Sequence, residues 1–152
     1  MDQVKVGKGR DSAESEVDQM RICLICGHQM VRSILDRALA RELGAEVEPF
    51  SCCEDALCSD LDHDMVIVYD YFGNARMNGP QGTKRLRVNM PDAYILGVTH
   101  NPGFDKQFLQ AGADTALVAG EKSVKKILHI AKHRVVTTLY PAEAQSLSGK
   151  QA

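Results

Sequence analysis

The stretch YILGVTHNPGFDKQFLQAGADTALVAG, from Tyr94 to Gly120, contains two apolar runs on either side of a short helical pattern. Residues 93–98 and 115–118 each have the length and the apolar, partly β-branched composition of a buried strand. Between them, apolar residues recur at helical spacing from Phe104 until Gly112 ends the pattern. Two strands joined by a helix run parallel with a right-handed crossover, so this stretch predicts part of a parallel sheet.

The same alternation continues back to residue 21 and forward to the last predicted helix. Three more strands are predicted at residues 22–26, 45–50 and 65–69. The helices are expected at 30–39 with a stop at Gly44, at 52–58, from Pro80 through Arg87, and at 124–135 with Ser123 as the N-cap.

Five apolar strands with helices between them favour a parallel sheet covered on both faces. We therefore expect an α/β, flavodoxin-like three-layer sandwich with strand order 2-1-3-4-5. Pro49 lies inside the second strand, and proline cannot donate to a central ladder of hydrogen bonds. This proline fits the order above, because the second strand is then at an edge of the sheet.

The composition excludes several classes of protein. The chain has 152 residues, of which 44% are apolar and 25% are charged, and its formal net charge is −2. This mix is typical of one globular domain and not of a disordered or fibrous chain. Without a basic excess, we expect no direct binding of nucleic acid. No apolar run approaches the ~20 residues that span a bilayer, and no secretory signal is visible, so we expect a cytoplasmic protein without membrane contact.

The two ends of the chain lack the periodicity of the middle. Residues 1–20 hold eight charged residues, and we expect them to form a flexible acidic tail. Residues 21–139 are expected to form the domain, and residues 140–152 a second flexible tail.

Five cysteines are present, and two of them, Cys23 and Cys26, form a C-x-x-C pattern. The pattern falls in a predicted strand, where residues three apart point to opposite faces. Such thiols cannot share a metal ion or form a disulfide, so we interpret them as inert core residues.

The segment from Arg21 to about Val135 resembles receiver domains of the two-component response-regulator family. The resemblance rests on the strand that ends at Thr99, on the turn Ala111-Gly112-Ala113-Asp114, and on DMVIVYD at residues 64–70. It implies a signalling module that takes a phosphoryl group on an aspartate after the third strand. By the family's pattern Asp70 is the candidate phosphoacceptor, with Tyr69 in an alternative alignment, and Thr99 is the candidate switch residue.

The other positions that the family uses are eroded. The resemblance places two Mg²⁺-binding acids after the first strand, where this chain has Cys26 and Gly27, followed by His28. It also places a lysine after the fifth strand, where this chain has Ala119. Phosphoryl transfer needs a metal ion and a cation to neutralise the charge that develops on the phosphoryl oxygens. We therefore expect a pseudo-receiver that works by protein–protein interaction, and no cofactor.

The sequence is also compatible with two other functions. The chain could be an atypical phosphorelay receiver that is phosphorylated at Asp70 and binds Mg²⁺. It could also be a small-ligand or metal-binding domain of the same fold, which would use Cys26, His28 and His100. We find no catalytic triad, P-loop or acid pair, so we do not expect an enzyme.

Basic residues recur at helical spacing on the last predicted helix, opposite its apolar stripe. We interpret them as a docking face for an acidic signalling partner. The resemblance adds a homodimer through the last strand and helices as an alternative contact. The docking face consists of Lys122, Lys125, Lys126, His129, Lys132 and His133.

Overall fold

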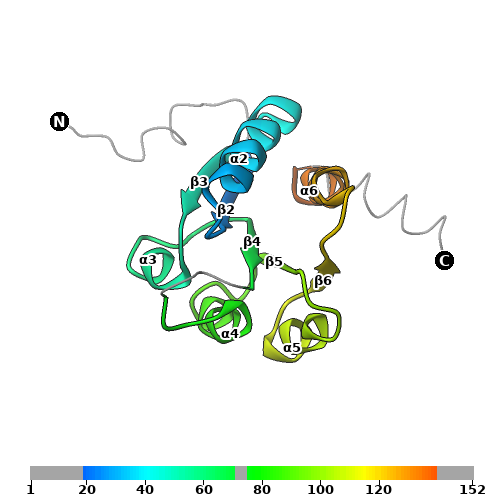
Figure 1. Ribbon diagram of the computed structural model, residues 1–152. Coiled ribbons are helices and arrows are strands. Elements are labelled where there is room, and N and C mark those ends of the chain that lie inside the picture. Colours follow the sequence, from blue (N-terminus) through cyan, green and yellow to red (C-terminus); the bar gives the residue numbers. More distant parts are fainter. Residues whose placement is uncertain (1–18, 71–74, 140–152) are drawn as a thin grey trace, which may run out of the picture.

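The computed structural model describes residues 19–70 and 75–139, the last five of these by backbone only. Within these ranges five parallel strands form one sheet in the order β3-β2-β4-β5-β6 (Figure 1). The strands are β2 (Arg21–Ile25), β3 (Glu46–Phe50), β4 (Met65–Tyr69), β5 (Tyr94–Thr99) and β6 (Thr115–Val118). The helices are α2 (Gln29–Leu43), α3 (Cys53–Leu57), α4 (Gly79–Asn89), α5 (Phe104–Ala111) and α6 (Ser123–Leu139).

Helices cover both faces of the sheet. The pair α2 and α6 lies against one face, and α3, α4 and α5 lie against the other (Figure 1). The central strand β4 is buried along its whole length, which explains why it carries no polar residue. The three-layer sandwich and the order 2-1-3-4-5, counted along the chain, are therefore confirmed.

The edge position of the second strand is confirmed as well. Pro49 lies in β3 and is the register partner of Leu24 in β2. Among the described strands, β3 pairs with β2 alone, so the missing N–H of Pro49 leaves no central hydrogen bond unmade.

The two described residues before the predicted domain, Gln19 and Met20, also contact it. Met20 is only 2% exposed and belongs to the core, because its carbonyl accepts from Glu46 N at 2.8 Å and draws this residue against β3. Gln19 Nε2 donates to the Gly44 carbonyl oxygen at 3.1 Å. The rest of the predicted tails, residues 1–18 and 140–152, lies outside the described residues.

The predicted helix ends are correct at Gly44 and differ slightly at Ser123. Gly44 ends α2 in the left-handed conformation, with φ of 65°, which glycine adopts without steric cost. Ser123 is the first residue of α6 rather than its N-cap, since its hydroxyl bonds the backbone of Gly120.

All five cysteines are unpaired. Cys23, Cys26 and Cys53 are buried, and burial raises the pKa of the Cys53 thiol to about 12. Thiols that stay protonated at neutral pH are poor nucleophiles and poor metal ligands. Among the described residues, no helix is both long enough and apolar enough to cross a bilayer.

Candidate functional site

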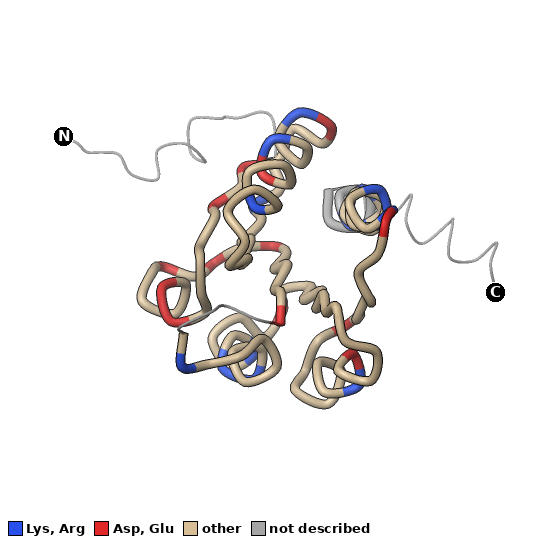
Figure 2. Tube along the Cα trace, viewed as in Figure 1, with Lys and Arg blue, Asp and Glu red and all other residues tan. Residues whose placement is uncertain are grey.

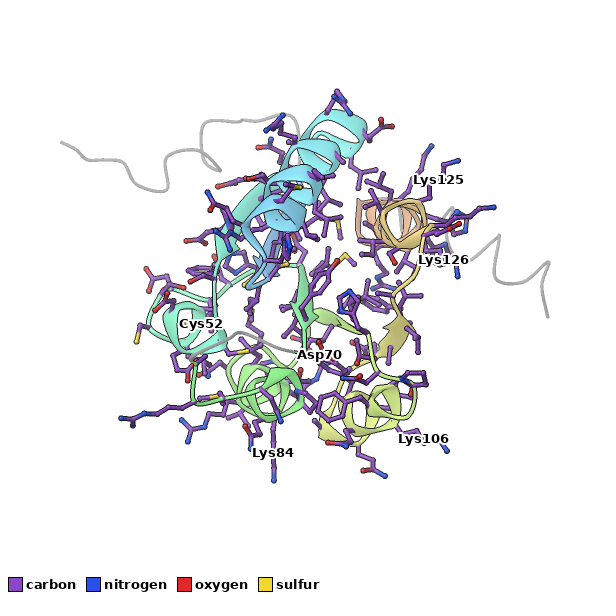
Figure 3. All side chains as sticks on the ribbon, viewed as in Figure 1. Cys52, Asp70, Lys84, Lys106, Lys125 and Lys126 are labelled. Atoms are coloured by element: carbon purple, nitrogen blue, oxygen red, sulfur yellow. The ribbon has the colours of Figure 1, made fainter. Side chains whose placement is uncertain are left out.

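Asp70 lies directly after β4, at the carboxyl edge of the sheet. The β4–β5 register pairs Tyr69 with Val98, so the next residues along each strand, Asp70 and Thr99, are neighbours. Both are buried, with Asp70 4% and Thr99 0% exposed. Figure 3 shows Asp70 at the centre of the molecule, beyond the end of β4. In parallel α/β sheets this edge is where ligands and reacting groups collect.

A hydrogen-bond network holds the Asp70 carboxylate. The Thr99 hydroxyl donates to Asp70 Oδ2, and His100 N donates to the same oxygen at 3.3 Å. Asn101 N donates in turn to Thr99 Oγ1 at 3.0 Å. The carboxylate therefore anchors the loop between β5 and α5.

Tyr69 points to the opposite face of the sheet from Asp70, because adjacent residues alternate along a strand. Its ring is 6% exposed and lies 6.3 Å from the His100 ring, between centroids. Burial raises the pKa of its phenol, with a smaller contribution from Cys26, so the hydroxyl stays protonated. The two candidates for the phosphoacceptor thus occupy different environments, and only Asp70 is hydrogen-bonded to Thr99.

The residues after β2 supply no carboxylate. Cys26 is 1% exposed, its thiol donates to the His28 carbonyl oxygen at 3.6 Å, and burial raises its pKa. Gly27 is exposed. His28 is the N-cap of α2, where Nδ1 accepts from Val31 N at 3.4 Å. Cys26 and His28 therefore both take part in the connection between β2 and α2.

Arg32 is a cation at this edge that the sequence analysis did not identify. It lies in the first turns of α2, and its Nη1 donates to the Cys26 carbonyl oxygen at 2.7 Å. Acidic residues are favoured in the first turn of a helix, and α2 has none there. The sequence signal that could have identified Arg32 is therefore a basic residue close to the start of this helix.

The end of β6 carries no cation at the position where the resemblance implies a lysine. Ala119 occupies that position, and its N–H donates to the Thr99 carbonyl oxygen at 2.6 Å. The four lysines labelled in Figure 3, which are Lys84, Lys106, Lys125 and Lys126, all project away from Asp70.

The described donor set at this edge offers Mg²⁺ a single carboxylate, that of Asp70. This ion is bound through one or two carboxylates together with phosphate and water. Asp70 is the one carboxylate at the ends of β2 and β4 within the described ranges, and two donors already use its Oδ2. In the part of the chain that the structure describes, no three His, Cys, Asp or Glu side chains gather as metal ligands.

Part of the predicted docking face lines a hollow beside α6. Lys125, His129 and Lys132 line a hollow of about 310 Å³ between α6 and the end of α2, together with Glu42, Leu43 and Leu128. Lys126 and His133 are seven residues apart and do not line it, and Lys122 precedes the helix. Three of the six predicted residues therefore line the hollow.

Comparison with known proteins gives a clear result at the level of backbone structure. No family model matches the chain, and no curated protein sequence does. Among solved structures, the BeF3-activated receiver domain of DrrB has a TM-score of 0.68 at 14% identity, over 78% of this chain and 98% of that one. The chain has the receiver fold.

Two further solved structures support this assignment. The response regulator TrrA from Thermotoga maritima, in complex with Mg(2+)-BeF, has a TM-score of 0.65 at 21% identity, over 75% of this chain and 98% of that one. An orphan response regulator of H. pylori has a TM-score of 0.62 at 21% identity, over 76% and 95% of the two chains. Identities this low establish the receiver fold and leave the chemistry to this chain's own residues.

Proposed function

We propose that this chain is a pseudo-receiver, a signalling module that binds a protein partner without Mg²⁺-dependent phosphorylation of Asp70. The observation that carries the proposal is the environment of Asp70. Its Oδ2 accepts from Thr99 and His100, and Cys26 and Ala119 stand where the resemblance implies an acid and a lysine.

The missing charges matter because of the reaction they would support. Transfer of a phosphoryl group to a carboxylate develops charge on the phosphoryl oxygens, which a metal ion and a cation neutralise. The hydrogen bond that the Arg32 guanidinium makes among the described residues goes to the Cys26 carbonyl oxygen and not to Asp70. A buried carboxylate with two donors is instead suited to holding the β5–α5 loop in one arrangement.

In this proposal the output passes through protein contacts, and the module lies in the cytoplasm. Five unpaired cysteines agree with a reducing compartment. The basic residues of α6 favour an acidic partner, since complementary charge speeds and orients association. A homodimer through β6 and the helices beside it is a further form that this contact could take.

One observation favours a second candidate, an atypical phosphorelay receiver. Asp70 and Thr99 are neighbours across β4 and β5, as a phosphoacceptor and a switch hydroxyl would have to be. A receiver of this kind would have to recruit Mg²⁺ with Asp70 as the main ligand.

An NMR titration of the full chain separates the two candidates. Mg²⁺ is added first, then beryllofluoride, and the amide signals of Asp70, Thr99 and His100 are followed. We expect no saturable shift at these residues. A matched variant with Cys26→Asp, Gly27→Asp and Ala119→Lys tests whether restored charges produce one. Saturable shifts in the unmodified chain, abolished by Asp70→Asn, would support the phosphorelay receiver instead.

A further inference from the structure

The hollow between α2 and α6 combines an apolar floor with basic side chains of α6. Leu43 and Leu128 are half-buried in it, and three exposed basic residues of α6, Lys125, His129 and Lys132, surround it together with one exposed acid of α2, Glu42. Within residues 19–70 and 75–139, none of these three basic side chains has an ion-pair or hydrogen-bond partner. Figure 2 shows α6, with its lysines in blue, alongside α2. This surface therefore matches an acidic segment with some apolar character.

The chain itself brings such a segment to this place. Residues 11–18, DSAESEVD, contain four acids, no base and one valine. The next residue, Gln19, donates from Nε2 to the Gly44 carbonyl oxygen at 3.1 Å. Gly44 directly follows Leu43, which lines the hollow. The acidic segment therefore starts beside one wall of the hollow.

The segment is also long enough to reach the opposite wall. Eight extended residues span about 26 Å, at roughly 3.3 Å each. The basic residues of α6 from Lys125 to Lys132 extend over about 10 Å of the helix, at roughly 1.5 Å of rise per residue. A tethered segment has an effective concentration of about 1 mM at a nearby site, so even a weak contact would be well populated.

We infer that residues 11–18 dock into the hollow between α2 and α6 and cover its basic wall. In this arrangement the acids Glu14, Glu16 and Asp18 face the basic wall formed by Lys125, His129 and Lys132. Val17 contacts the apolar floor formed by Leu43 and Leu128. The contact itself does not depend on the function of the module. Its consequence rests on the proposed function: an acidic partner must displace the segment, so the segment inhibits docking.

NMR on the full-length protein tests the contact. The double variant Glu14→Gln with Glu16→Gln should shift the methyl signals of Leu43 and Leu128 and the amide signal of His129. The unmodified protein in 0.5 M salt should shift in the same direction, because salt screens exposed charges. A control with Asp2→Asn and Glu143→Gln loses two charges elsewhere and should leave these signals in place. If the Glu14 and Glu16 variant matches the unmodified protein, the inference is wrong.

Substitutions on α6 give the reciprocal test. Lys125→Glu with Lys132→Glu should reproduce the shift of Leu43, and adding Glu14→Lys with Glu16→Lys to it should reverse that shift. The control Lys122→Glu with Lys126→Glu changes charges outside the hollow and should have no effect on Leu43. No reversal in the combined variant would overturn the inference. Signals that move with protein concentration would also overturn it, since a second copy would then occupy the hollow.

A synthetic peptide of residues 11–18 measures the competition directly. It should bind the Glu14→Gln, Glu16→Gln protein at least about fivefold more tightly than the unmodified protein, whose own segment competes for the same surface. Equal affinities would contradict intramolecular docking. None of these measurements uses Mg²⁺ or a partner, so their outcome is separate from that of the beryllofluoride titration.

Discussion

At the scale of single residues, the candidate site depends on one carboxylate and the groups that donate to it. Asp70 is buried, and its Oδ2 accepts from the Thr99 hydroxyl and from His100 N. A buried carboxylate that loses a donor keeps the cost of its desolvation. The proposed structural role of Asp70 therefore makes Thr99 important for stability, whether or not any phosphoryl group is ever bound.

We predict that Thr99→Val lowers the free energy of unfolding by about 1–3 kcal/mol, because the isosteric side chain leaves Asp70 with one donor fewer. Urea denaturation measures the change. Thr83→Val is the matched control, since the Thr83 hydroxyl is buried without a hydrogen-bond partner among the described residues. Its replacement should be neutral or slightly stabilising. Equal losses in both variants would show that the Thr99–Asp70 bond contributes nothing.

Gly79 is the residue that lets α4 approach the Asp70 backbone. Its N–H donates to the Asp70 carbonyl oxygen at 3.0 Å, and an added Cβ would lie 2.3 Å from the Tyr69 carbonyl oxygen. We predict that Gly79→Ala costs about 1–3 kcal/mol of stability through overpacking. Gly120→Ala is the control, since nothing lies within 4 Å of its Cβ position. A melting temperature unchanged by Gly79→Ala would contradict this packing.

At the scale of elements, loops at the opposite edge of the sheet are held by Arg87 of α4. Its guanidinium donates to the Gly112 and Ala93 carbonyl oxygens, at 2.9 and 2.7 Å, and pairs with Asp114 Oδ2 at 2.6 Å. Asp114 Oδ2 also accepts from Ile95 N at 2.8 Å. One side chain thereby connects α4, the start of β5 and the turn before β6.

We predict that Arg87→Lys destabilises the fold by about 1–2 kcal/mol, because a single ammonium cannot replace the several donors of a guanidinium. Arg85→Lys, two residues away on an exposed position, should change stability by less than about 0.5 kcal/mol. Thermal unfolding of both variants checks the difference. Identical curves would mean that the Arg87 contacts are dispensable.

At the scale of the whole molecule, the fold followed from the sequence because its signals are local. Apolar strands such as β4 and helix stops such as Gly44 are visible in short windows. The arrangement around Asp70 was harder to predict from the sequence. The spacing of residues along one strand does not tell with which residues of the next strand they pair. The β4–β5 pairing that places Asp70 against Thr99 joins residues 29 positions apart.

Contacts between segments far apart in the sequence could not be predicted for the same reason. The hollow joins the end of α2 to α6, more than 80 residues later, and neither helix alone indicates it. Arg32 was missed because its role depends on how α2 leaves the sheet. The eroded positions Cys26 and Ala119 were identified from the family's pattern, and their consequence for phosphorylation is still a prediction.

The stability of the whole molecule should depend on pH through His63. Its side chain is 1% exposed, and Nε2 lies 2.8 Å from Glu48 Oε1. Burial lowers its pKa, opposed by the hydrogen bond to Glu48, so the folded protein favours the neutral ring. The unfolded chain takes up the proton more readily, so this contribution is complete above the unfolded pKa of about 6.5 and is lost as pH falls.

We predict that the free energy of unfolding decreases between pH 7 and pH 5, by at most about 1.4 kcal/mol per pH unit from this one proton. Urea denaturation at several pH values measures the slope. The variant His63→Gln should have a shallower slope over the same range, whatever its absolute stability. An unchanged slope would assign the pH dependence to other groups.

The most direct test of the account is phosphorylation of the unmodified full-length chain by an acyl phosphate in the presence of Mg²⁺, followed by intact mass spectrometry. We predict no phosphorylated species of the unmodified chain, whereas the variant with Cys26→Asp, Gly27→Asp and Ala119→Lys should gain one phosphoryl group. A phosphoryl group on the unmodified chain that disappears with Asp70→Asn would contradict the central claim.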